Sequence, residues 1–186
     1  EEIDRIISAV DRSKAEGQRN RAILETLYSC GLRVSELVNL KLSDLYFDEG
    51  FIKVEGKGSK QRLVPISPRA INEIKLYFTD RNRIEVKKEY EDFVFVSQRR
   101  GKGLSRIMIF HMIKELAQTA GIIKNISPHT FRHSFATHLL EGGANLRAIQ
   151  CMLGHESIAT TEIYTHIDRN MLRSEIIEHH PRNIKY

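Results

Sequence analysis

Residues 51–66 interrupt a hydrophobic pattern that is otherwise mainly helical. Residues 51–54 and 62–66 are short apolar-rich runs typical of β-strands, and the loop at 56–61 between them contains two glycines. Glycine readily adopts the positive φ angles of tight turns, so this stretch is predicted to be an antiparallel β-hairpin. Residues 93–96 form another short apolar run, which we interpret as the third strand of the same sheet.

Elsewhere the apolar residues recur every three or four positions, which is the spacing of amphipathic helices. A chain of 186 residues can bury one good core, so these helices and the sheet are expected to form a single domain. The predicted fold class is α+β, mainly α-helical, with a small three-stranded antiparallel sheet. The expected helices cover residues 3–10, 19–30, 68–78, 105–120, 128–141, 146–153 and 168–180.

The composition favours a negatively charged partner and argues against a membrane protein. The formal net charge is +5 and the pI is about 9.3, as in many proteins that bind nucleic acid. No apolar run approaches the roughly 20 residues that span a bilayer, and the acidic first residues do not resemble a signal peptide. Cys30 and Cys151 have neither metal-binding nor disulfide-rich spacing. We therefore expect a cytoplasmic protein.

The predicted hairpin loop carries or adjoins three basic residues, Lys57, Lys60 and Arg62. These side chains could simply be solvated, but a loop of this composition is also suited to contacting a phosphate backbone. The loop lacks the G-x-x-x-x-G-K-[ST] spacing of a nucleotide-binding P-loop. We interpret Lys60 and Arg62 as candidate DNA-binding residues.

Arg33 lies in an apolar segment, where an unpaired charge would be costly. Glu36 follows three residues later, so the two side chains are expected on one face of a helix. One interpretation is a purely structural ion pair. The other is that Glu36 holds the guanidinium of Arg33 so that it points at an external oxyanion. These residues alone favour the structural pair.

A further cluster begins at Ser127, which is expected to cap a helix that has proline at its first position. His129 and Arg132 would share a face near the start of this helix, where free N–H groups favour an anion. His129 and His133 also have the spacing of metal ligands, but the glutamate of the H-E-x-x-H motif is missing. We therefore expect neither a metal nor a cofactor.

Two other interpretations of this region stay open. The helices on either side of Gly142-Gly143 could form a helix-turn-helix DNA reader, which also fits the basic charge. His155 and Tyr164, each considered alone, could be ordinary core or surface residues.

Five ordered blocks resemble the tyrosine recombinase family, and together they extend over essentially the whole chain. Within that family the similarity is closest to bacterial recombinases of the XerC/XerD type. The resemblance implies a catalytic core of the tyrosine recombinase and type IB topoisomerase kind. The blocks are GLRVSEL at 31–37, GKGSK at 56–60, PHTFRHSFATH at 128–138, LGH at 153–155 and IYTH at 163–166.

The resemblance implies that Tyr164 is the nucleophile, which joins a DNA 3′-phosphate and frees a 5′-hydroxyl. Arg33 and Arg132 would bind the non-bridging oxygens of the phosphate, and His155 would donate a hydrogen bond to one of them. Glu36 would orient Arg33. Guanidinium groups can stabilise the charge of the reacting phosphate without a metal.

Proton transfer is assigned by the same resemblance. Lys57 matches the family's position for the acid that protonates the leaving oxygen, with Lys60 on the same loop as the alternative. His129 would serve Tyr164 as a base or as a hydrogen-bond partner. Such help is needed because a phenol, with a pKa near 10, is a poor nucleophile at neutral pH.

The resemblance also suggests how the protein is organised. Residues 1–186 are expected to be the catalytic domain of a longer recombinase, without its N-terminal DNA-clamping domain. The helix at 168–180 could fold onto its own core or dock on a neighbouring protomer. The expected partners are double-stranded DNA and related protomers in a homo- or hetero-tetramer, in the cytoplasm at the nucleoid.

The expected function is site-specific DNA recombination, either for chromosome dimer resolution or for mobile-element integration and excision. Two alternatives are retained. One is a non-catalytic helix-turn-helix DNA-binding module. The other is a type IB topoisomerase, which shares the chemistry but performs no strand exchange.

Overall fold

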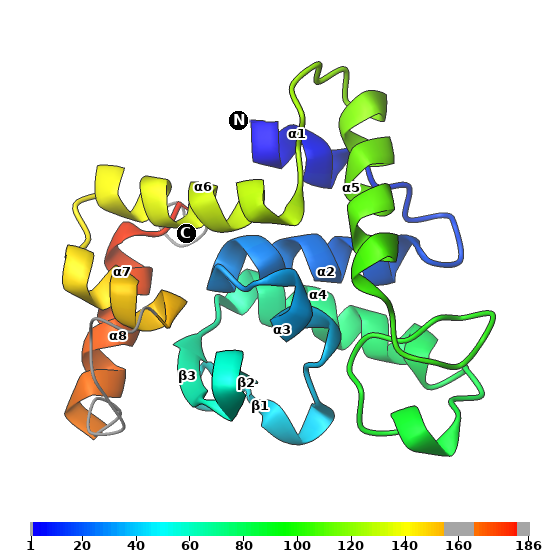
Figure 1. Ribbon diagram of the computed structural model, residues 1–186, viewed down its shortest axis with the longest axis horizontal. Helices are drawn as coiled ribbons and strands as arrows, with labels where there is room; N and C mark the ends of the chain where they lie inside the picture. The colour runs from blue at the N-terminus through cyan, green and yellow to red at the C-terminus, as the bar shows by residue number, and fades with distance from the viewer. Residues whose placement is uncertain (1, 155–165, 182–186) are drawn as a thin grey trace.

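The protein, seen here as a computed structural model, is described over residues 2–154 and 166–181. The fold class and the predicted helices are confirmed, and no helix in the described ranges is long and apolar enough to cross a membrane. Figure 1 shows α2 (Gly17–Cys30) near the centre, with α6 (Pro128–Glu141) on one side of it and the sheet on the other.

The other helices are α1 (Glu2–Ser8), α3 (Val34–Val38), α4 (Pro68–Arg81), α5 (Arg106–Thr119), α7 (Leu146–Leu153) and α8 (His166–His179). The strands are β1 (Leu45–Tyr46), β2 (Phe51–Glu55) and β3 (Gln61–Pro65), and the short 3₁₀ turns are η1 (Leu42–Asp44), η2 (Lys57–Ser59) and η3 (Lys88–Tyr90).

The predicted hairpin is confirmed, since β2 and β3 pair antiparallel along their length. The tip between them is η2, in which Gly58 and Ser59 have positive φ angles of 73° and 60°. The third strand of the sheet is β1, which pairs antiparallel with the other edge of β2. The hairpin therefore projects a basic tip from a sheet that is otherwise packed against the core.

The prediction that residues 93–96 supply the third strand is wrong, because side chains of α4 occupy the backbone groups that a sheet partner would use. The hydroxyl of Tyr77 donates to the carbonyl of Val94 at 3.0 Å and accepts the N–H of Val96 at 3.1 Å. The guanidinium of Arg81 donates to the carbonyl of Val94 and to that of the residue before it. The segment therefore forms only isolated bridges.

The hydrophobic core has two clusters, the larger one around α2 and a smaller one among α6, α7 and α8. The smaller cluster includes Leu139, Ile149, Met152, Leu172 and Ile176, all buried. Each such side chain contributes roughly 1.5–3 kcal/mol when it is removed from water. This packing fixes α7 against α6, and so sets the position at which the chain leaves α7.

The end of α8 is tied to α2 and α6 by hydrogen bonds of two histidines. The Nε2 atom of the buried His180 lies 3.2 Å from the carbonyl oxygen of Tyr28, and Nδ1 of His179 lies 2.6 Å from that of Gly142. The end of α8 therefore contacts its own chain here, and docking of this helix on a neighbouring protomer stays a prediction.

Candidate active site

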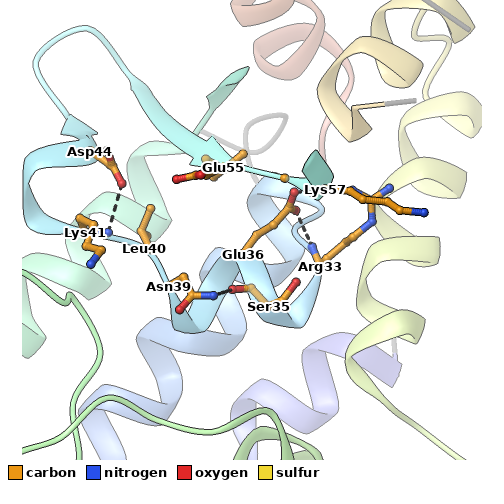
Figure 2. Close-up of a pocket in the computed structure, with 11 residues that line it drawn as sticks. Arg33, Ser35, Glu36, Asn39, Leu40, Lys41, Asp44, Glu55 and Lys57 are labelled. Carbon is orange, nitrogen blue, oxygen red and sulfur yellow. Dashed lines mark hydrogen bonds and ion pairs between the residues drawn. The ribbon is translucent and has the colours of Figure 1, made fainter. Parts of the chain in front are cut away.

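Arg33 and Lys57 line one pocket of about 800 Å³, although they come from different parts of the fold. Arg33 is the residue that precedes α3, and Lys57 opens the turn at the hairpin tip. Figure 2 shows the two side chains extending toward the same side of the pocket. Both are exposed, so the pocket presents two cations to solvent at one place.

Glu36 explains the position of Arg33. Its Oε1 atom accepts the backbone N–H of Arg33 at 2.9 Å, and its Oε2 atom lies 3.6 Å from the guanidinium (Figure 2). The Glu36 side chain is buried, whereas that of Arg33 is 42% exposed. The pair thus fixes the start of α3 and still leaves the guanidinium accessible to an external anion.

Arg62 does not lie where a DNA-binding residue was expected. It is 7% exposed, and its Nη1 and Nη2 atoms donate to both carboxylate oxygens of Glu36, at 2.5 and 3.0 Å. Its Nε atom donates to the carbonyl of Met152, near the end of α7, at 2.8 Å. All three guanidinium nitrogens of Arg62 donate within the protein, so the side chain connects two parts of the site, and its contact with DNA stays a prediction.

The sequence contains a signal for this inward position. Side chains alternate between the two faces of a strand, so Arg62 shares a face of β3 with Val64. Val64 is fully buried, and the same face continues to the buried Ile66. Alternation along the strand, rather than distance from the loop, would have placed Arg62 in the interior.

Arg132 is also buried, at 8% exposure, and it joins two other helix ends. Its Nη1 atom donates to the carbonyl of Gly31, just after α2, at 2.7 Å, and Nη2 donates to that of Leu153 at 2.8 Å. His129, which was expected to share its face, is exposed in the first turn of α6. The two side chains therefore lie in different environments despite their spacing.

The charges that act on Arg132 are mostly positive. Burial, and then the charges of Arg33 and Arg62, lower the pKa of Arg132 to about 10, with Glu36 acting in the opposite sense. Burial alone would raise the pKa of Glu36. The hydrogen bonds and charge of Arg62, together with the N–H and charge of Arg33, outweigh burial and hold that pKa below its usual range. An anion bound at this site would relieve the remaining repulsion between the arginines.

The sequence also predicted site roles for Lys60, His155 and Tyr164. Lys60 is exposed beside the hairpin tip, as a phosphate-contacting residue should be. His155 and Tyr164 lie outside the described residues. Within the described ranges, no group of three or more His, Cys, Asp or Glu side chains is placed to hold a metal ion. The structure thus brings Arg33, Glu36 and Lys57 together at one pocket, and Arg132 lies near enough to Arg33 and Glu36 for their charges to affect its pKa.

The amino-acid sequence of the chain is similar to those of known proteins. Residues 1–171 match the phage integrase family. The chain is 45% identical over 181 residues to the tyrosine recombinase XerD of Pseudomonas putida. This match covers 97% of the chain and 60% of that protein. The chain is also 51% identical over 164 residues to the tyrosine recombinase XerD of Chlorobaculum tepidum. That match covers 88% of the chain and 54% of the relative. The chain spans about 60% or less of the length of these two relatives.

Solved structures give the same result. The crystal structure of XerA recombinase superposes with a TM-score of 0.75 and 40% identity, over 97% of this chain and 62% of that one. The pre-cleavage complex of the XerH site-specific recombinase with its difH substrate gives a TM-score of 0.72 and 30% identity. That match covers 88% of this chain and 48% of the XerH chain.

Proposed function

Since the chain belongs to the phage integrase family, we propose that it cleaves and rejoins DNA at specific sites through a covalent 3′-phosphotyrosyl intermediate. The observation that carries this proposal is that Arg33 and Lys57 line one pocket with the buried carboxylate of Glu36, while the charges of Arg33 and Glu36 also act on Arg132. Guanidinium and ammonium groups suit a phosphodiester.

Arg33 and Arg132 are proposed to bind the two non-bridging oxygens of the scissile phosphate. Negative charge grows on these oxygens as phosphorus becomes five-coordinate, so fixed guanidinium groups stabilise the transition state more than the ground state. The guanidinium of Arg132 donates to two carbonyls, and that of Arg33 lies 3.6 Å from the carboxylate of Glu36. Groups that are oriented before the reaction lower its barrier, because less reorganisation is needed during it.

The bond changes follow from the proposed roles. The phenolic oxygen of Tyr164 forms a bond to phosphorus while the bond to the 5′-oxygen breaks. Lys57 donates a proton to that leaving oxygen, and His129 accepts the phenol proton or a hydrogen bond from it. His155 donates a hydrogen bond to a non-bridging oxygen. Rejoining is the reverse reaction, in which a 5′-hydroxyl attacks the phosphotyrosine.

Double-stranded DNA is the proposed substrate, at the nucleoid, with related protomers assembled on it as a tetramer. In support, the solved relative XerH is described as bound to its difH substrate. The exposed Lys57 and Lys60 at the hairpin tip add cations beside the proposed phosphate position. Such contacts release counterions and give affinity without sequence specificity.

A trapped adduct tests the proposal. Duplexes that bind the natural full-length protein are selected from random sequence, and a nick is placed so that the strand released by cleavage diffuses away. The unchanged protein should accumulate a covalent protein–DNA adduct. Tyr164→Phe should bind the same duplex with similar affinity and form no adduct.

Each alternative predicts a different result. A helix-turn-helix module would bind the selected duplex and form no adduct with any nicked version, which would contradict the proposal. A type IB topoisomerase would form the adduct and relax supercoiled DNA, but it would not exchange strands between two duplexes. Strand exchange between labelled duplexes therefore distinguishes recombination from relaxation.

A further inference from the structure

We propose that Arg62 is a positioning residue for the reaction, and that it couples the Arg33–Glu36 pair to the C-terminal end of α7. The inference rests on the proposed function. Arg62 is only 7% exposed. Its guanidinium donates three hydrogen bonds, two to the carboxylate of Glu36 and one to the carbonyl of Met152.

The first two bonds hold Glu36. Nη1 and Nη2 of Arg62 donate to the two carboxylate oxygens at 2.5 and 3.0 Å, and the partner residues are 26 positions apart in sequence. Glu36 also accepts the backbone N–H of Arg33 and lies 3.6 Å from its guanidinium. One carboxylate is therefore shared between a buried arginine and an exposed one. Because Arg62 binds both oxygens, Glu36 cannot rotate to bind the Arg33 guanidinium bidentately and draw it back from an anion.

The third bond reaches the other side of the site. Nε of Arg62 donates to the carbonyl of Met152 at 2.8 Å, 90 positions away in sequence, and the next carbonyl, of Leu153, accepts from Arg132. The last turn of α7 is thus held by two arginines, at the end of a helix where cations are favoured. Both proposed phosphate-binding arginines are connected, through Arg62 or directly, to one helix end.

Gly154 adapts the chain to this arrangement. It ends α7 with a φ angle of 73°, and a Cβ atom at this position would lie 3.0 Å from Nη1 of Arg62. The backbone therefore passes close to the guanidinium immediately before His155 in the sequence. A shift of Arg62 would be transmitted to the point where the chain leaves α7.

Lysine cannot replace this residue, although it keeps the charge. A guanidinium donates in fixed, divergent directions, whereas one ammonium group on a flexible stem cannot reach both Glu36 and the Met152 carbonyl. The chain offers a matched control in Arg81, which is 9% exposed and donates to the carbonyls of Glu91, Phe93 and Val94. Arg81 is about as buried as Arg62, but the hydrogen bonds described for it go to carbonyls within residues 91–94 and not to the site.

The test compares Arg62→Lys with Arg81→Lys in the natural full-length protein. Adduct formation is measured in single turnover on the nicked duplex, with DNA affinity and melting temperature measured in parallel. Arg62→Lys should react on the order of 100-fold more slowly, the scale expected for a misplaced binding group. Its DNA affinity should change less than about threefold, because phosphate contacts by exposed residues dominate binding. Arg81→Lys should lose stability and keep its rate.

A double-variant cycle tests the route through Arg33. If Arg62 acts by positioning Arg33, then Arg62→Lys should cost only a few-fold in an Arg33→Ala background, since interacting sites are not additive. The full loss in both backgrounds would overturn the inference. An unchanged rate in folded Arg62→Lys, or equal losses in Arg62→Lys and Arg81→Lys, would also overturn it.

If Arg62→Lys does not fold at the assay temperature, Glu36→Gln tests the same link, because its amide can accept only one of the two bonds from Arg62. A folded Glu36→Gln with an unchanged rate would overturn the inference, and a loss of at least about tenfold would support it. If the unchanged protein binds DNA but forms no adduct, the proposed function itself fails. An adduct from the unchanged protein therefore separates the two failures.

Discussion

The carbonyl oxygen of Leu153, the last residue of α7, accepts a hydrogen bond at 2.8 Å from Nη2 of Arg132 in α6. The other terminal nitrogen of the same guanidinium donates to the carbonyl of Gly31, after α2. One side chain thus joins the ends of two helices and also supplies charge to the proposed phosphate site. Its contribution to stability and its contribution to function should therefore be lost together.

Arg132→Ala should lower the free energy of unfolding, because it leaves two buried carbonyl oxygens without their donor at about 1–3 kcal/mol each. Arg33→Ala should cost about 1 kcal/mol or less, since its ion pair with Glu36 is partly exposed. Both variants should form the adduct far more slowly than the unchanged protein. Urea unfolding followed by circular dichroism measures the first effect, and the nicked duplex measures the second.

A similar loss of stability in the two variants would contradict this distinction. So would retention of adduct formation in Arg33→Ala, because that residue has no comparable structural role to obscure the result.

Much of the fold follows from local patterns in the sequence. The helices were predicted from apolar residues that recur every three or four positions. The error at residues 93–96 has a different origin. Apolar composition indicated a buried extended segment, but it could not show that Tyr77 and Arg81 would satisfy its backbone groups.

The site shows the same division between local and long-range information. The importance of Arg33, Glu36 and Arg132 was inferred from family resemblance, and the pairing of Arg33 with Glu36 from the cost of an unpaired charge. The link from Arg62 to Met152 joins residues 90 positions apart, so no local pattern predicts it. Long-range hydrogen bonds of this kind depend on how α7 packs on the sheet.

Glu36→Gln should change how stability depends on pH. Because the pKa of Glu36 is lowered in the folded protein, the carboxylate adds stability above its unfolded pKa of roughly 4.3. That contribution is lost as the pH falls through the lower, folded pKa. Glu36→Gln should therefore be less stable than the unchanged protein at pH 7, by about 1–3 kcal/mol, with the difference narrowing below about pH 4.

Urea unfolding of both proteins between about pH 3 and 7 checks this expectation. A stability difference that stays constant over the whole range would show that the ionised form of Glu36 is not the one that matters.

Inorganic phosphate or sulfate should raise the melting temperature of the protein. Repulsion from Arg33 and Arg62 helps to lower the pKa of Arg132, and an anion in the site would relieve it. At an anion concentration of about 100 times the Kd, the stabilisation is roughly 2.7 kcal/mol. Arg33→Ala should reduce the shift. Sodium chloride at equal ionic strength is the control, and an equal shift with chloride would indicate screening rather than binding.

Lys60→Ala should weaken the salt dependence of DNA binding. A lysine that contacts a phosphate releases a condensed counterion, so its removal should reduce the slope of log K against log salt concentration by about 1. Lys75 is a suitable control, since it is exposed on α4 and lines a different pocket, away from the hairpin tip. Lys75→Ala should leave the slope unchanged. Equal changes in the two variants would mean that DNA contacts a much wider surface than the hairpin tip.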